Sequence, residues 1–173
     1  MNVVIIDYGA GNIQSIRFAL ARLGITAALS DDISIIKNAS HVIFPGVGEA
    51  SSAMEKLRAT KLDKLLPTLT QPVLGICLGM QLMCKHTEEG NTQGLGIFDT
   101  AVVRFETNLN VPHMGWNSVE GKGILFENID ANRYFYLVHS YYAIPNEDMV
   151  GACTYNVPFA AALAKDNFYG TQF

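Results

Sequence analysis

VLGICLGMQL, residues 73–82, joins two patterns of different period around a single cysteine. A short apolar run typical of a buried strand follows Pro72, and helix-like spacing of apolar residues follows Cys77. Gly75 and Gly79 flank the thiol at two positions on either side and remove side chains that would collide in a tight turn. This spacing predicts a strand-turn-helix elbow with Cys77 at its corner.

The predicted elbow gives Cys77 a chemical role. At the N-terminal end of a helix, unpaired N–H groups and the helix dipole favour an anion, so we expect a lowered thiol pKa and a reactive thiolate. The backbone N–H of Leu78 is expected to point towards a developing oxyanion. A free cysteine is usually a small buried hydrophobic residue, which is our interpretation of Cys84 and Cys153. For Cys77, the strand, the helix and both glycines together favour a nucleophile.

Strand and helix patterns alternate from the elbow back towards the N-terminus. Strands are predicted over residues 2–7, 25–30, 41–45 and 72–76, with helical patterns between them. Near-continuous apolar strands separated by helices are typical of a parallel sheet that is covered on both faces. We therefore expect residues 5–80 to form a doubly wound half, with the functional loops at the carboxyl ends of its strands.

From about residue 95 the pattern changes to short strand-like runs joined by turns, which indicates an antiparallel second half. No repeat, low-complexity tract or linker separates the halves, so they are expected to share one core. The predicted fold is α/β, with a central, mostly parallel sheet flanked by helices and an antiparallel β portion in the C-terminal half. We interpret residues 1–173 as a single domain.

A glycine-rich loop, PGVGE at 45–49, ends the third predicted strand. In a parallel sheet this loop is expected to lie beside the elbow, where its amides could face a developing negative charge. The amides of Val47 and Gly48 are the candidates. Taken by itself, the same loop fits a plain turn before a helix.

A second glycine-rich loop, GAGN at 9–12, suggests a dinucleotide fingerprint. The position that requires the third glycine is Gln14, which argues against such a site, and we predict no cofactor. Asn12 is instead placed to cap a helix. The apolar face of that helix is expected to reach Leu23, and Gly24 to end it.

Composition excludes several classes of protein. The chain has 173 residues, 49% of them hydrophobic and 16% charged, which is typical of a globular protein. A net charge of −4 with scattered basic residues argues against a nucleic-acid partner. No apolar stretch approaches the roughly 20 residues that span a bilayer, so we expect a cytoplasmic protein without a membrane partner. Three widely spaced cysteines favour neither a disulfide framework nor a metal site.

Five motifs together resemble the class I glutamine amidotransferases. They are DYGAGN at 7–12, FPGVGEASSAM at 44–54, GICLGMQLM at 75–83, PHMGWN at 112–117 and YFYLVHSYY at 134–142. GICLGMQ is similar to the class in general. PHMGWN together with DYGAGN resembles the glutaminase subunits of imidazole glycerol phosphate synthases. The resemblance spans nearly the whole chain.

The resemblance implies a glutaminase reaction and a set of site residues. Cys77 would attack the side-chain amide of glutamine, ammonia would leave, and water would hydrolyse the γ-glutamyl thioester. The amides of Val47 and Leu78 would stabilise the oxyanion. The residues implied to hold the substrate are Gly48, Gln81, Glu89, Ser140 and Tyr141. From the sequence by itself, Gln81 fits a helix surface and Glu89 a solvated loop charge equally well.

The resemblance also implies a partner, a (β/α)8-barrel cyclase subunit that receives the ammonia within a heterodimer. Asn12, Met114 and Trp116 would lie towards that interface. Core packing is a strong alternative for Trp116, the single tryptophan of the chain. Two other functions remain open: an amidotransferase that serves a different ammonia acceptor, and a non-catalytic binding or regulatory subunit.

One motif of the family is missing from the sequence. A triad cysteine needs a base, which the family supplies as the histidine of a His-Pro-Glu motif directly after a Gln-Phe strand end. Because the sequence ends at Phe173, we interpret it as C-terminally truncated relative to the family. The histidine and its glutamate are expected just after Phe173, and the chain as written is expected to be inactive. His139 is the nearest substitute, although a structural role is favoured for it.

Overall fold

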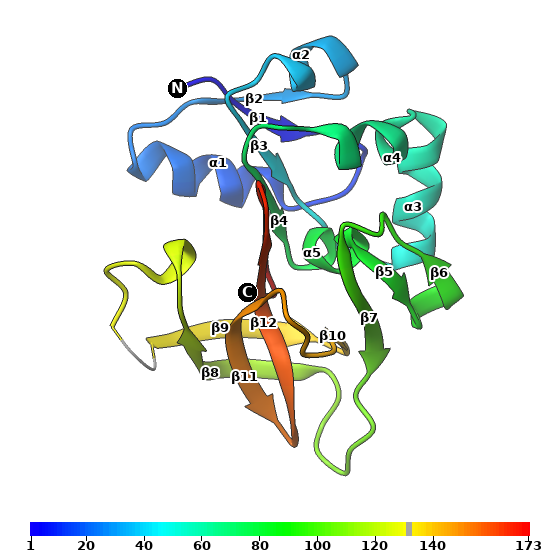
Figure 1. The fold of residues 1–173 in the computed structure, drawn as a ribbon, viewed down its shortest axis with the longest axis vertical. Coiled ribbons are helices and arrows are strands. Elements are labelled where there is room, and N and C mark those ends of the chain that lie inside the picture. Colours follow the sequence, from blue (N-terminus) through cyan, green and yellow to red (C-terminus); the bar gives the residue numbers. More distant parts are fainter. Residues whose placement is uncertain (131–132) are drawn as a thin grey trace.

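The first half of the chain alternates strands and helices in the computed structural model, which describes residues 1–130 and 133–173 (Figure 1). Its strands pair in parallel in the order β2-β1-β3-β4. This arrangement confirms the predicted doubly wound half. The elements are β1 (Val3–Ile6), α1 (Ile13–Arg22), β2 (Ala27–Ser30), α2 (Ile33–Lys37), β3 (His41–Phe44), α3 (Ala50–Ala59), α4 (Leu62–Leu65), η1 (Leu66–Thr68), β4 (Val73–Ile76) and α5 (Leu78–Met83).

The second half is mostly antiparallel, as predicted. β10 pairs antiparallel with β7 and β12, β11 with β12 and β8, and β8 with β9. The elements are β5 (Cys84–Thr87), η2 (Glu89–Asn91), β6 (Thr92–Gln93), β7 (Phe98–Arg104), β8 (His113–Gly121), η3 (Ile124–Phe126), β9 (Arg133–His139), β10 (Tyr141–Ala143), β11 (Met149–Tyr155), β12 (Val157–Lys165) and β13 (Phe168–Thr171).

The strand β5 was not predicted, and it pairs in parallel with β7. α5 ends after six residues, all of them buried, and the chain becomes extended at Cys84. A run that is buried on every side carries no periodicity that marks where helix gives way to strand. The apolar run therefore predicted no strand at residues 84–87, which lie before the antiparallel half expected from about residue 95.

The last strand, β13, joins the two halves into one sheet. It pairs antiparallel with β12 and parallel with β4, beside which it runs in dark red in Figure 1. One buried cluster draws side chains from both halves, among them Val4, Leu57, Met80, Leu163 and Phe168. The predicted shared core is confirmed. β13 also brings the end of the described chain next to the elbow that follows β4.

The helix α1 begins at its predicted cap. The Asn12 side chain accepts the Ser15 amide at 3.3 Å at the start of α1. α1 ends at Arg22, so Leu23 lies outside the helix and is exposed, contrary to the predicted apolar face. The helix ends there because Gly24 adopts a φ of +73°. Within the described residues, no helix combines the length and the apolar composition needed to cross a bilayer.

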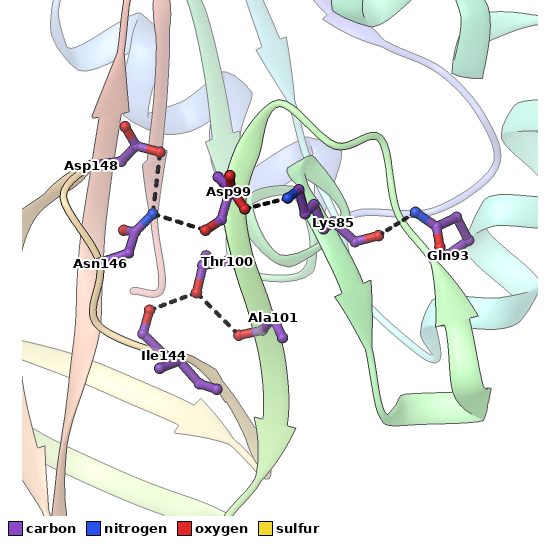
Figure 2. Close-up of polar contacts among 8 residues, drawn as sticks. All are labelled: Lys85, Gln93, Asp99, Thr100, Ala101, Ile144, Asn146 and Asp148. Carbon is purple, nitrogen blue, oxygen red and sulfur yellow. Dashed lines mark hydrogen bonds and ion pairs between the residues drawn. The ribbon is translucent and has the colours of Figure 1, made fainter.

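Polar contacts fix the segment that follows β10 against β7 (Figure 2). The Thr100 hydroxyl donates to the Ile144 carbonyl at 2.7 Å, and the Asn146 amide donates to the Asp99 carbonyl at 3.3 Å. These two hydrogen bonds hold the residues that follow β10 in one position against β7. They hold β10 in place, and with it Tyr141 at the beginning of that strand.

Candidate active site

Cys77 occupies the predicted corner between β4 and α5. Its φ of 54° and ψ of −113° are unusual for a residue with a side chain, and such backbone strain concentrates at functional sites. The Cys77 amide donates to the Thr171 carbonyl at 2.7 Å, so β13 holds the corner from its other side. The predicted elbow is confirmed.

The glycines of the elbow allow α5 to begin against the end of β3. A Cβ on Gly79 would overlap the Phe44 carbonyl oxygen, and a Cβ on Gly46 would overlap the Gly79 amide. A Cβ on Gly75 would lie 2.5 Å from the Met83 sulfur. The glycines therefore allow the loop after β3 to pack against the beginning of α5, next to Cys77.

A cavity of about 360 Å³ opens over the thiol. Eight of its lining residues are those predicted for catalysis and substrate binding: Val47, Gly48, Cys77, Leu78, Gln81, Glu89, Ser140 and Tyr141. Three others complete the wall, Pro112, Val138 and His139. The structure thus gathers loops from β3, the elbow, η2 and the β9–β10 connection around one sulfur atom.

The thiol is half-buried, and its electrostatics differ from the expectation. Burial is the largest influence and raises the pKa of Cys77 above the ordinary value. Hydrogen bonds from the Leu78 amide and the Gln172 side chain lower the pKa, and the charge of Glu89 raises it. The expected net lowering by the helix was wrong, because burial outweighs the effect of the short α5.

Gln81 is buried rather than on a helix surface, which rules out the surface alternative. Its Nε2 donates to the Tyr141 carbonyl at 3.0 Å and to the Gln172 Oε1 at 2.8 Å. Both amide hydrogens are therefore used within the protein. The Oε1 of Gln81 is the part of the amide that remains for a ligand in the cavity.

Glu89 lies half-buried in the cavity wall, not in solvent as the loop alternative supposed. Its Oε2 accepts the Ala50 amide at 2.9 Å, at the start of α3. Burial raises the pKa of Glu89, the Ala50 hydrogen bond lowers it, and the nearby Glu49 charge raises it again. A partly desolvated carboxylate in this position favours a cationic group on the ligand.

His139 also lines the cavity, but both of its ring nitrogens are engaged. Its Nδ1 lies 2.8 Å from the Tyr141 carbonyl, which only accepts, so Nδ1 carries the proton. Its Nε2 lies 3.1 Å from the Nδ1 of His113 and accepts from it. Burial lowers the pKa of His139 to about 4 and also lowers that of His113. A neutral, fully bonded imidazole fits the structural role that was favoured for His139.

The buried histidine predicts a loss of stability in acid. The unfolded chain binds a proton near pH 6.5, whereas folded His139 binds it near pH 4, so stability is full above pH 6.5 and falls as the pH drops towards 4. Urea unfolding at pH 7.5 and pH 4.5 should show that His139→Phe recovers up to about 3 kcal/mol of this loss. His41→Gln, outside the cavity, is the control. Equal pH slopes in the wild type and His139→Phe would contradict the expectation.

Gln172 is a site residue that was missed. It follows β13, is 1% exposed, and its Nε2 lies 3.6 Å from the Cys77 sulfur. The Gln-Phe strand end was used only to locate the missing histidine, and no role was predicted for Gln172 itself. Its position depends on the pairing of β13 with β4, which joins segments nearly one hundred residues apart.

Met114 and Trp116 lie outside the cavity, on the open face of the β8–β9 pair. They are 62% and 70% exposed, so the core alternative for Trp116 is wrong. Met114 stands opposite Val138 and Trp116 opposite Tyr136, with the last two rings 5.7 Å apart. We call the exposed side chains on this side of the strands the aromatic face: Met114, Trp116, Tyr134, Tyr136 and Val138. Asn12, the third predicted interface residue, is exposed at the start of α1.

Comparison with known sequences identifies close relatives. A chain from Bacteroides fragilis named imidazole glycerol phosphate synthase subunit HisH is 50% identical over 177 residues, which cover 100% of this chain and 90% of that one. A chain of the same name from Haemophilus influenzae is 47% identical over 176 residues and covers 100% and 88%. The matched region therefore spans every position of the cavity wall.

Solved structures share the fold. A structure described as a glutamine amidotransferase superposes with a TM-score of 0.78 at 17% identity, and the match covers 99% of this chain and 89% of that one. A glutamine amidotransferase from Thermotoga maritima gives 0.67 at 16% identity, covering 100% and 75%. The sequence profile described as "Glutamine amidotransferase class-I" matches residues 4–173. With the elbow cysteine in its cavity, these matches show that the chain belongs to the class I glutamine amidotransferase family.

Proposed function

We propose that this chain is the glutamine-hydrolysing subunit of an imidazole glycerol phosphate synthase and supplies ammonia for histidine biosynthesis in the cytoplasm. The observation that carries the proposal is the strained Cys77 in the wall of a cavity that Val47 and Leu78 also line. The 50% identity to a relative named as such a subunit supports the pathway.

In the proposed reaction the Cys77 sulfur attacks the side-chain carbonyl carbon of glutamine. The oxyanion that forms accepts hydrogen bonds from the amides of Val47 and Leu78. The C–N bond then breaks, the proton from the thiol is passed to the leaving nitrogen, and ammonia departs from a γ-glutamyl thioester. Water hydrolyses the thioester to glutamate and restores the thiol. A thioester divides amide hydrolysis into two smaller barriers.

The substrate is proposed to lie with its amino acid end away from the sulfur. The free Oε1 of Gln81 and the carboxylate of Glu89 suit the α-ammonium group, since both are acceptors. The backbone around Ser140 and Tyr141 suits the α-carboxylate, because both residues line the same cavity and a backbone N–H can donate to a carboxylate. Gly48, with a φ of +97°, lets the backbone approach the side-chain amide closely.

The base is proposed to come from the segment that follows Phe173. The Gln172 side chain touches the Cys77 sulfur, so this strand end already borders the thiol. Each further residue moves the chain by at most about 3.6 Å, so a residue directly after Phe173 could still reach the sulfur with its side chain. Because burial raises the pKa of Cys77, attack requires a group that removes the proton. Among the described residues, His139 is the histidine that lines the cavity, and both of its nitrogens are occupied.

The partner is proposed to be a (β/α)8-barrel cyclase subunit that docks on the aromatic face. Val138 belongs both to this face and to the cavity wall, so a partner seated there would cover the exit for ammonia. Exposed apolar side chains that are grouped around two aromatic rings mark a protein interface more often than a free surface. Asn12 is proposed to lie towards the edge of the same interface.

Trp116→Ala is expected to weaken binding of the cyclase subunit about 30-fold or more, because central aromatic residues carry most of an interface's affinity. Titration calorimetry with the purified subunit measures this affinity. Ile35→Ala, which removes an exposed apolar side chain on α2, is the matched control and should leave the affinity unchanged. Equal losses in both variants would mean that the aromatic face is not the docking surface.

Alkylation of Cys77 tests the proposed substrate without requiring turnover. Glutamine bound in the cavity should slow the reaction of the Cys77 thiol with iodoacetamide, as measured by mass spectrometry of the labelled peptide. Asparagine, which is one methylene shorter, should protect less. An identical rate with and without saturating glutamine would contradict the proposal.

A further inference from the structure

We propose that Gln172 is a further catalytic residue of this site, and that its side-chain amide holds and stabilises the sulfur of Cys77 as the thiolate. The inference rests on the proposed function for the reaction that the thiolate performs. It assigns to Gln172 a role that the motifs around the nucleophile do not indicate.

The first support is the position of Gln172 against the sulfur. Its Nε2 is 3.6 Å from the Cys77 sulfur, within the longer hydrogen-bond range of sulfur acceptors, and the side chain is 1% exposed. The preceding residue, Thr171, accepts the Cys77 amide at 2.7 Å. Two successive residues of one strand end therefore hold the nucleophile, one through its backbone and one through its side chain.

The second support is that the orientation of the Gln172 amide is fixed. Its Oε1 accepts from the Gln81 Nε2 at 2.8 Å. A rotated amide would turn its N–H groups towards the N–H of Gln81 and its oxygen towards the sulfur. That arrangement would remove both hydrogen bonds and set two donors against each other. The amide thus presents a donor to Cys77 and not an acceptor.

Gln81 is itself fixed by a chain of hydrogen bonds that reaches β8. Its second N–H donates to the Tyr141 carbonyl at 3.0 Å, which also accepts from the His139 Nδ1 at 2.8 Å. The Nε2 of His139 accepts from the Nδ1 of His113 at 3.1 Å. In each of these hydrogen bonds, only one of the two partners can be the donor. Gln81, His139 and His113 are therefore positioning residues that act through Gln172.

The chemical consequence is a sulfur held by neutral donors in a partly buried site. Burial disfavours the thiolate, whereas the donors Gln172 and Leu78 favour it. A donor of fixed direction costs little reorganisation when the charge forms on the sulfur. Loss of the Gln172 donor should therefore reduce the fraction of thiolate at neutral pH without closing the cavity.

The experiment measures the rate of Cys77 alkylation by iodoacetamide against pH in the chain as it exists. Gln172→Met keeps the length of the side chain and removes the donor, and Gln172→Glu keeps its shape and replaces the donor by an acceptor. We expect the midpoint to rise by about one pH unit in Gln172→Met, with about tenfold slower labelling at pH 7.5, and to rise further in Gln172→Glu. Gln71→Met is the control, since Gln71 donates to the Ile36 carbonyl at 2.8 Å, away from the thiol.

Two outcomes would overturn the proposal: an unchanged midpoint in Gln172→Met with an intact thermal transition, or an unchanged midpoint in Gln172→Glu if the methionine variant does not fold. Separate measurements test the role of Gln172 and the proposed function, so the failure of one can be told from the failure of the other. Protection of wild-type Cys77 by glutamine reports on the proposed function. The shift in the alkylation midpoint is measured without glutamine and reports on Gln172.

Discussion

Replacing Cys77 with alanine should abolish ammonia release from glutamine in a complex of the cyclase subunit with a chain that continues past Phe173. The sulfur is the atom that bonds to the substrate carbon, and no other group at the corner of the elbow can form the thioester. In triad hydrolases the loss of a nucleophile lowers kcat by about 10⁶. Coupled detection of glutamate measures the rate.

Cys84→Ala and Cys153→Ala are the controls for this substitution. Both cysteines are buried, and burial raises their pKa values, that of Cys153 to about 11. Their removal should leave the rate within a few-fold of the wild type once folding is confirmed. Glutamate release that persists in Cys77→Ala would show that another group carries the reaction.

A chain that ends at Phe173 should release ammonia about 10²- to 10⁴-fold more slowly than one extended by the His-Pro-Glu segment of the family, since general acid–base catalysis contributes about this factor. The buried thiol of Cys77 needs a proton acceptor, and His139 is bonded through both nitrogens. Both chains should bind glutamine similarly, because the cavity wall is the same.

The measurement is glutamate release by both chains at saturating cyclase subunit, with an extended chain that carries alanine in place of the added histidine as the control. That variant should behave like the shorter chain. Equal rates in all three chains would mean that a residue between Met1 and Phe173 serves as the base, and His139→Asn would be the first variant to examine.

The sequence was sufficient to predict the elbow because the relevant signals are local. The change of period at Cys77 and the glycines on either side of it fix a strand, a turn and a helix within ten residues. No such local signal marks β5. There the apolar run continues through Met83 and Cys84, both fully buried, and tertiary pairing with β7 determines the conformation.

The candidate site was only partly predictable, for a related reason. Apart from Glu89, the residues that line the cavity fall within motifs that resemble a known family, so their gathering around Cys77 could be anticipated. The base expected just after Phe173 implied that this strand end lies near Cys77, but the contact of Gln172 itself with the sulfur depends on the exact pairing of β13 with β4. The raised pKa of Cys77 could not be predicted either, since burial is a property of the folded chain. The exposure of Trp116 depends on which face of the β8–β9 pair remains open.

The proposed reaction depends most on a covalent bond between the Cys77 sulfur and the γ-carbonyl carbon of glutamine. The direct measurement is acid quenching of the extended chain with its cyclase subunit during turnover, followed by mass spectrometry of the peptide that contains Cys77. We predict one γ-glutamyl group on Cys77 and none on Cys84 or Cys153. Continued turnover with an unmodified Cys77 at every quench time, or an adduct on a different residue, would contradict the account.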